Sequence, residues 1–304
     1  MEAKVDTFAV IFSFVYQYAD NIAFLLLAAV GLVIIFGMMG VINMAHGELM
    51  MIGAYITAFS YHAGIPAPIA IIFAGIGAGL AGVVLERLII RFFYKKLLAS
   101  LVVTWGISLV LTEGWLLVFG PSILNVPTPF GSFAIGESGF GIYRAVLFFV
   151  SLALIGVVWF LFSYTGIGVR ARATMENPEM AEAFGINTSR MYALTFGLGS
   201  AFAGIAGGMF ALTATISPFF GINYTLLAFI TVVVGGGANV ISGIITSAAA
   251  LAGTQTILNN TWSVYIGYVS MMVAAFLFLL VLPRGISDYL EKRKLRVTRK
   301  NDSK

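Results

Sequence analysis

The chain has 304 residues, of which 60% are hydrophobic and only 10% are charged, and its mean hydropathy is +0.99. Soluble domains carry roughly 25% charged residues, so this composition excludes a soluble protein and indicates an integral membrane protein. The net charge is +4, from 17 basic and 13 acidic residues. Cysteine is absent, which excludes disulfide and thiol chemistry.

The apolar runs predict the fold class. Glu2, Lys4 and Asp6 do not form the basic region of a signal peptide, and no cleavage site follows residues 7–18. We therefore expect residues 7–18 to stay as a short first span or an interfacial helix. Further runs are long enough, or nearly so, for the ~20 residues that cross a ~30 Å hydrocarbon core as a helix. They do not alternate as barrel strands do. The sequence therefore predicts an all-α polytopic transmembrane bundle of about nine spans, within a range of eight to ten. The expected spans are residues 22–41, 48–62, 66–90, 98–119, 143–163, 191–214, 224–240, 243–258 and 264–282.

Basic residues set the expected orientation. Four Lys and Arg lie in residues 87–96, three in residues 170–190 and eight from Arg284 onward. Even numbers of predicted spans separate these regions, so they share one face, which the positive-inside rule assigns to the cytoplasm. We expect one transmembrane domain over residues 1–285. The tail, residues 286–304, is expected to be cytoplasmic and to contact anionic membrane lipids; no nucleic-acid module is expected.

Glycines cluster inside the predicted spans, at residues 75–79 and 197–208. Small residues at helical spacing let transmembrane backbones approach closely. We interpret the clusters as helix-packing surfaces, with a gating hinge as the alternative.

One polar stretch interrupts the apolar runs between Gly40 and Glu48, and it contains Asn43 and His46. Two interpretations remain open. Asn43 caps the next helix while His46 and Glu48 lie at the cytoplasmic interface, or the stretch is a break inside the bundle that lines a permeation path. The same Gly, Asn, Gly spacing returns at Gly236, Asn239 and Gly243, which permits a parallel internal repeat.

Three further side chains are candidates for a substrate path. Glu113 falls in an apolar span, so we expect it to point inward, where it contacts substrate or closes an interhelical hydrogen bond. Trp105 and Tyr224 are candidates for lining a passage, although aromatic residues at such positions usually pack or anchor a helix at the interface.

The segment 168–191 predicts a short capped helix on the positive face. Asn177 suits the N-cap and Pro178 the first helical position. Glu179 and Glu182 then favour the helix dipole, and Gly185 ends the helix. Apolar residues within it indicate a docking helix for a cytosolic partner, or else a helix lying on the membrane surface; they are Met180, Ala181, Ala183 and Phe184.

These motifs carry a family resemblance. Arg170-Ala171-Arg172-Ala173, Asn177-Pro178 and residues 181–186 resemble the cytoplasmic coupling segment of permease subunits in ABC importers for branched-chain amino acids, a family that includes urea and short-amide importers. Residues 40–48 are similar to a signature near the second span of that family, Val234-Gly235-Gly236 with Gly243 to its late glycine motif, and Pro283-Arg284-Gly285 to its C-terminal end.

The resemblance implies a second permease subunit, two cytosolic ATP-binding subunits and an extracytoplasmic solute-binding protein, in the cytoplasmic membrane of a bacterium or archaeon. It implies a transport subunit rather than an enzyme, and in agreement no Gly-Lys pair of a phosphate-binding loop occurs in the chain. No cofactor and no metal are expected. Coupling to the ATPase is expected at Arg170, Arg172, Asn177, Pro178, Glu179, Ala181, Glu182, Phe184 and Gly185. The expected substrate path is Asn43, His46, Glu48, Trp105, Glu113, Tyr224 and Asn239.

The substrate class stays open. Few fixed charges in the spans favour a small neutral or zwitterionic solute, either a branched-chain amino acid or urea and short amides. Thr104-Trp105-Gly106 looks closer to the urea branch, whereas Leu226-Leu227 departs from it. The alternatives are an ion-coupled secondary transporter that uses Glu48 or Glu113, and a passive solute channel. An intramembrane metalloenzyme is disfavoured, because His46-Gly47-Glu48 does not have the spacing of a zinc-binding helix.

Overall fold

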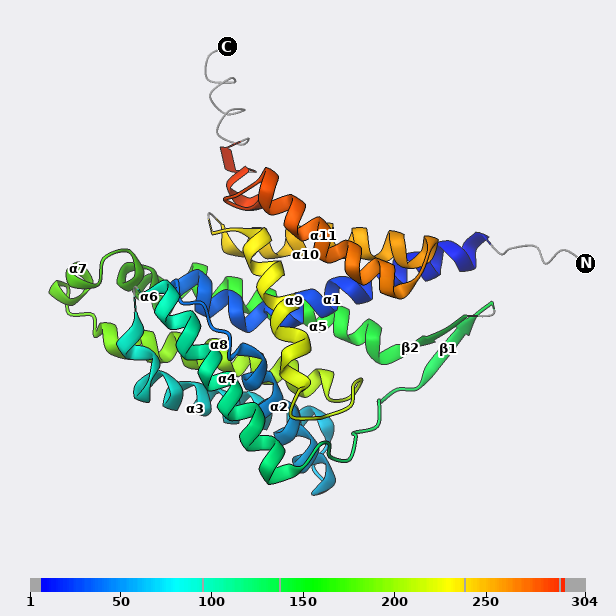
Figure 1. Cartoon of the computed structure of the whole chain (residues 1–304), viewed down its shortest axis with the longest axis horizontal. Helices are drawn as coiled ribbons and strands as arrows, with labels where there is room; N and C mark the ends of the chain where they lie inside the picture. Colours follow the sequence, from blue (N-terminus) through cyan, green and yellow to red (C-terminus); the bar gives the residue numbers. More distant parts are fainter. Residues whose placement is uncertain (1–6, 95, 137, 238, 290, 293–304) are drawn as a thin grey trace, which may run out of the picture. The chain divides into compact units, whose positions relative to one another are not determined.

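The computed structural model describes residues 7–94, 96–136, 138–237, 239–289 and 291–292. The basic tail from residue 293 and the N-terminal charges at Glu2, Lys4 and Asp6 lie outside them. The described elements (Figure 1) are α1 (Thr7–Met39), α2 (His46–His62), α3 (Ala67–Leu88), the 3-10 helix η1 (Ile90–Phe93), α4 (Leu97–Phe119), β1 (Ser132–Ile135), β2 (Ser138–Gly141), α5 (Ile142–Tyr164), α6 (Gly166–Glu176), α7 (Pro178–Ala183), α8 (Thr188–Phe210), α9 (Phe220–Gly235), α10 (Val240–Thr261) and α11 (Val264–Val281).

Every predicted span coincides with a helix, which confirms the polytopic helical bundle. Among the described residues, seven helices are long and apolar enough to cross a membrane, namely α1, α3, α4, α5, α8, α10 and α11. The other two predicted spans are shorter, with 17 residues in α2 and 16 in α9. Residues 7–18 are not a separate span or a separate interfacial helix, because they form the start of the continuous 33-residue α1.

The chain divides into two compact units. The first, called the α8 unit below, comprises residues 27–128 and 154–228. The second, called the hairpin unit, comprises residues 1–26, 129–153 and 229–304, of which only the described part is considered. Three helices, α1, α5 and α9, have residues in both units.

Backbone-to-backbone packing holds the α8 unit together. A Cβ added at Gly207 of α8 would overlap the backbone carbonyl of Met50 in α2, and one at Gly204 would overlap Ala78 of α3. Gly199 approaches Gly31 of α1 in the same way. Lipid is as apolar as the side chains, so transmembrane helices gain most from such close approach of small residues. The glycine clusters in the sequence are therefore packing surfaces, as predicted.

The hairpin unit contains the only strands of the described residues. β1 pairs with β2 in antiparallel register, from Ser132 opposite Gly141 to Ile135 opposite Ser138, and Gly136 in the turn has a φ of +64°. The hairpin lies against the start of α1, where Tyr16 donates a hydrogen bond to the carbonyl of Gly141 at 2.6 Å. Phe12 stacks edge-on against Phe133 and Phe140 of the strands. This hairpin is the one departure from the all-α prediction in the described part of the chain.

The glycine packing makes a stability prediction. Alanine normally stabilises a helix relative to glycine by ~1 kcal/mol, but at Gly207 the new Cβ must displace backbone of α2, which typically costs ~1–3 kcal/mol. We expect Gly207→Ala to lower the thermal unfolding temperature of the purified protein. The matched control is Gly114→Ala in α4, where a Cβ meets no atom within 4 Å, and it should leave the temperature equal or higher. A Gly207→Ala protein as stable as the Gly114→Ala protein would contradict the packing.

Candidate functional site

The polar stretch after α1 is a break inside the α8 unit. Gly40 adopts a φ of +59°, which glycine tolerates, and ends α1. The chain then runs back beside α1, because His46 at the start of α2 lies 2.8 Å from the carbonyl oxygen of Ala28 through its Nε2. Ala28 precedes the end of α1 by eleven residues, or roughly 16 Å of helix. α2 therefore starts beside the middle of α1 rather than at its end.

All three polar side chains of the stretch are buried. Asn43, His46 and Glu48 are 2%, 0% and 1% exposed. Asn43 does not cap α2 as one interpretation expected, because its Oδ1 accepts a hydrogen bond from the Ala45 backbone N–H at 3.1 Å and the N-cap position is Ala45 itself. The Asn43 Nδ2 and the His46 Nδ1 are buried without a partner among the described residues. The structure favours the buried break over the interfacial loop.

Glu48 reaches from α2 to α4. Its Oε1 accepts hydrogen bonds from the Ser108 hydroxyl at 2.7 Å and from the Thr112 hydroxyl at 3.3 Å. Ser108 and Thr112 are one helical turn apart, so both face α2. Sequence reasoning did not single out these two hydroxyls, although their spacing in an apolar span is the signal that identifies a polar face. They orient the Glu48 carboxyl group.

Two short helices begin beside each other at the break. A Cβ added at Gly47, in the first turn of α2, would overlap the carbonyl of Gly221 and the hydroxyl of Thr225 in the first turns of α9. Since α2 starts beside the middle of α1, α9 also starts inside the bundle, which accounts for the short lengths of both helices. Starts of broken helices inside a membrane protein carry partial positive charge and form solute sites in transporters.

Two further path candidates, Tyr224 and Asn239, have different surroundings. Tyr224 packs within the α8 unit, stacked on Phe210 at 4.6 Å and close to Phe220 at 4.9 Å between ring centroids. Asn239, in the hairpin unit, is exposed and caps α10, since its Oδ1 accepts from the Ser242 N–H at 3.2 Å. Gly236 precedes it with a φ of +81°, as Gly40 precedes Asn43. The two Gly-Asn-Gly stretches thus share the helix-ending glycine, but not the role of the asparagine.

Glu113 does not point into its own chain. It is exposed, as is Trp105 two turns earlier on α4, and it has no hydrogen-bond or ion-pair partner in the described ranges. Within this chain the inward orientation and an interhelical hydrogen bond of Glu113 are thus not observed, because α4 has most of its surface uncovered. Contact of Glu113 with a substrate stays a prediction.

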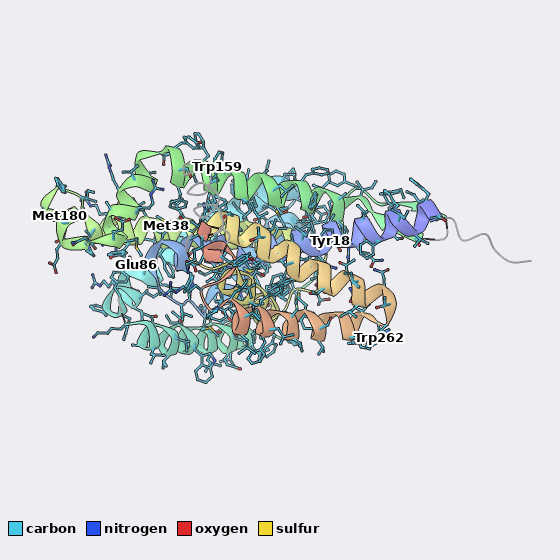
Figure 2. The ribbon with its side chains drawn as sticks, turned by 90° about the horizontal axis from the view of Figure 1, so that it is seen from above. Tyr18, Met38, Glu86, Trp159, Met180 and Trp262 are labelled. Carbon is cyan, nitrogen blue, oxygen red and sulfur yellow. The ribbon has the colours of Figure 1, made fainter. Side chains whose placement is uncertain are left out.

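The segment 168–191 forms two helices, α6 and α7. Asn177 caps α7 as predicted, since its Oδ1 accepts from the Met180 N–H at 3.0 Å, and Gly185 ends it with a φ of +79°. Ala181 is buried, while Met180 and Phe184, one turn apart, are 55% and 80% exposed. Figure 2 shows Met180 at the tip of this segment, pointing away from the neighbouring helices.

Hydrogen bonds join this segment to the transmembrane part of the α8 unit. The Thr188 hydroxyl, at the start of α8, donates to Glu182 of α7 at 2.5 Å, and Arg172 of α6 donates to the Phe162 carbonyl of α5. The remaining coupling candidates, Arg170, Pro178 and Glu179, lie on the same two helices. The short helix is thus fixed to α8 rather than loosely attached.

A second buried acid, which sequence reasoning missed, lies beside the start of α8. Glu86 of α3 is 1% exposed and accepts a hydrogen bond from the Tyr94 hydroxyl. The Tyr94 ring in turn lies 4.2 Å from that of Tyr192 in α8. Burial, and next the hydrogen bond to Glu86, raise the pKa of Tyr94 well above its usual value. The phenol therefore remains a donor at physiological pH.

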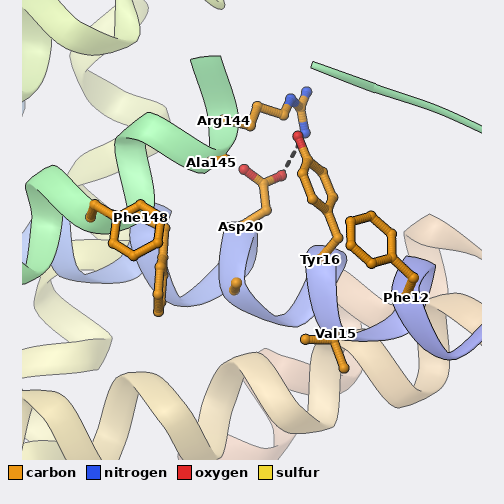
Figure 3. A pocket seen from close by; sticks show the side chains of 9 residues that line it. Phe12, Val15, Tyr16, Asp20, Arg144, Ala145 and Phe148 are labelled. Carbon is orange, nitrogen blue, oxygen red and sulfur yellow. Dashed lines mark hydrogen bonds and ion pairs between the residues drawn. The ribbon is translucent and has the colours of Figure 1, made fainter. Parts of the chain in front are cut away.

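A cavity of about 220 Å³ lies in the hairpin unit between α1 and α5 (Figure 3). Arg144 donates to Asp20 Oδ2 at 2.6 Å at its edge, and this pair neutralises a carboxylate within the span of α1. The walls are otherwise apolar and aromatic, so we assign the cavity no polar ligand. Its lining residues are Phe12, Val15, Tyr16, Ala19, Asp20, Arg144, Ala145, Phe148 and Phe149.

Taken together, a polytopic helical bundle with a buried polar break, at which two short helices begin, is typical of membrane transport proteins. The chain belongs to the family of permease components of branched-chain amino acid transport systems, whose model matches residues 15–282.

Several relatives support this membership. The high-affinity branched-chain amino acid transport system permease protein LivH of Salmonella typhimurium is 32% identical over 287 residues, which cover 88% of this chain and 92% of that protein. LivH of Escherichia coli is 30% identical over 292 residues, with the same coverage. The guanosine ABC transporter permease protein NupQ of Bacillus subtilis is 26% identical over 195 residues, covering 58% of this chain and 60% of that protein. No solved structure matches the chain.

The Tyr94–Glu86 hydrogen bond predicts a pH-dependent effect of Tyr94→Phe. Leaving Glu86 buried without this donor should lower the free energy of unfolding by ~1–3 kcal/mol. The folded-state pKa of Tyr94 is raised, so its contribution is fully present below the ordinary tyrosine value of about 10 and is lost as pH rises beyond it. The free energies of unfolding of the wild-type and Tyr94→Phe proteins, measured by thermal unfolding, should therefore differ by a constant amount between about pH 6 and pH 9. Above pH 10 the two values should converge. Equal stability of the two proteins at neutral pH would contradict the role of this bond.

Proposed function

We propose that the chain is the membrane-spanning subunit of an ATP-driven ABC importer that moves a small zwitterionic or neutral solute received from an extracytoplasmic binding protein. The observation that carries the proposal is α7, a capped helix outside the spans that presents two exposed apolar side chains, Met180 and Phe184. Neither an ion-coupled transporter nor a channel requires such a helix. Family membership supports the same assignment.

The proposed assembly has four further parts. A second permease subunit, homologous or identical, completes the membrane core, and its contact would cover the exposed Glu113 on α4. Two cytosolic ATP-binding subunits complete the complex, of which one docks on α7, and a solute-binding protein docks on the opposite side. The complex resides in the cytoplasmic membrane of a bacterium or archaeon. The C-terminal tail, residues 286–304, lies on the cytoplasmic side next to anionic lipids and follows the transmembrane domain, residues 1–285.

The contacts of α7 describe how ATP use reaches the spans. A shift of α7 acts on the start of α8 through Glu182 and Thr188. α8 packs without intervening side chains on α2 at Gly207, so it cannot slide far without moving α2. α2 carries Glu48 and begins at the break. Rigid-body rocking of these helices against the second permease would then exchange access between the two faces.

Branched-chain amino acids are the first substrate candidates, because relatives that cover most of the chain carry that name. NupQ, named for guanosine, shows that relatives of this chain differ in their substrates. Urea and short amides remain the second candidate class, on the strength of Thr104-Trp105-Gly106.

Docking on α7 predicts the effect of Phe184→Asp. Interface aromatic residues often contribute 2 kcal/mol or more, so burying a carboxylate there should reduce ATP-dependent uptake by about tenfold or more. The assay is uptake into proteoliposomes that contain the complete complex. Phe184 is 80% exposed in this chain, so the substitution should not affect folding.

The matched control is Phe184→Leu, which keeps an apolar side chain at the same position and should retain most of the uptake. Wild-type uptake by the Phe184→Asp complex would exclude α7 as the docking helix. Solute flux by the chain alone, without any ATPase, would exclude the ABC assignment altogether.

A further inference from the structure

The contact between α2 and α4 contains three buried polar groups that the described part of the chain leaves without partners. They are the second carboxylate oxygen of Glu48, the hydroxyl of Tyr55 and the indole N–H of Trp115. Glu48 and Tyr55 are seven residues apart on α2, and Thr112 and Trp115 are three apart on α4, so each pair shares one helix face. We call this contact the α2–α4 seam.

The seam is continuous from the carboxyl group to the aromatic residues. Glu48 is held by Ser108 and Thr112, and two turns further along, the Tyr55 ring meets the Trp115 ring edge-on at 6.1 Å between centroids. Helical side chains generally lean toward the N-terminus, and Glu48 lies on that side of Tyr55 on α2. Phe119 closes the far end, 5.3 Å from Tyr55 between ring centroids.

These unpartnered polar groups lower the stability of the protein if they have only a structural role. A buried hydroxyl or N–H without a partner costs free energy, and an isolated carboxylate inside a membrane costs more. No Lys or Arg occurs in α2 or α4, and Glu48 has no ion-pair partner in the described ranges. A phenylalanine at either aromatic position would avoid the unpaired polar atom.

The chemistry of the three groups defines a complementary ligand. Glu48 supplies a carboxyl oxygen as an acceptor, while Tyr55 and Trp115 supply two uncharged donors. The rings of Tyr55, Trp115 and Phe119 supply an apolar wall between and beyond them. A solute that matches carries an ammonium group, a carboxylate and an aliphatic side chain. Urea lacks both charges and the apolar part.

We infer that the α2–α4 seam is the intramembrane binding site for a zwitterionic aliphatic amino acid. The carboxyl group of Glu48 binds the ammonium, and the Tyr55 hydroxyl and the Trp115 N–H bind the carboxylate. Ser108 and Thr112 are positioning residues that hold Glu48. The inference rests on the proposed function and narrows its substrate class from amino acid or amide to amino acid.

The test uses Tyr55→Phe in the complete complex, because this substitution removes only the unpaired oxygen. If the hydroxyl is merely structural, its loss leaves both uptake and thermal stability unchanged or improved. If it binds the substrate carboxylate, ATP-dependent leucine uptake at saturating loaded binding protein falls by about tenfold while the stability is kept. Trp115→Phe and Glu48→Gln should lower uptake in the same way.

The matched control is Tyr61→Phe, the same change on α2 outside the seam, which should leave uptake unchanged. Wild-type leucine uptake by all three seam variants would overturn the inference and leave the proposed function intact. Loss of urea uptake rather than leucine uptake in these variants would overturn the amino-acid assignment. Absence of ATP-dependent uptake by the wild-type complex would instead overturn the proposed function itself.

Discussion

The structure depends on a constraint that a membrane imposes on any interruption of a helix: every backbone group in the interruption needs a partner inside the protein. Thr104 of α4 supplies one of these partners, because its hydroxyl accepts from the Met44 N–H at 3.0 Å. Its own proton lies within reach of the Ile42 carbonyl at 3.2 Å and, closer, of the Ser100 carbonyl of α4 at 2.8 Å. Asn43 supplies a second through the Ala45 N–H. Side chains thus satisfy part of the break, while the Asn43 Nδ2 and the His46 Nδ1 stay without a partner among the described residues.

Glycine packing around α8 makes the same region suitable for motion as a unit. Three helices approach α8 so closely that no side chain fills the gap, which leaves a rigid assembly rather than a compliant one. The first turn of α8 is bonded to α7, and its last turns contact α2 just beyond the break. A single helix therefore connects the proposed site of ATPase docking with the proposed site of the solute.

Much of the fold follows from the sequence, since apolar run length and the caps of α7 depend on local chemistry. Asn177, Pro178 and Gly185 act as their side chains and backbone preferences dictate. The depth of the break was not predictable, because no local feature of residues 40–47 tells how far the chain turns back along α1. The exposure of Glu113 was missed for a related reason: it depends on which face of α4 other helices cover. The hairpin has only four residues per strand and no strong alternation, so it gives little signal.

Some residues of the candidate site could likewise be predicted from the sequence, and others could not. Asn43, His46 and Glu48 are conspicuous in an apolar chain and were predicted individually. Tyr55, Ser108, Thr112 and Trp115 gain their meaning only from the pairing of α2 with α4, sixty or so residues apart in the chain, which a single sequence does not reveal. The sequence therefore identified Glu48, whereas the neighbouring side chains on α2 and α4 were identified only from the fold.

The burial of the break is the claim from which the rest follows, and it is open to direct measurement because the chain has no cysteine. Val41, within the break, is 1% exposed, and Met180 on α7 is 55% exposed. Single-cysteine variants Val41→Cys and Met180→Cys, treated with a membrane-impermeant maleimide in the folded protein, compare the two positions. The account predicts rapid labelling of Met180→Cys and labelling of Val41→Cys only after denaturation. Equal labelling of both in the folded protein would show that the segment is an interfacial loop and would contradict the account.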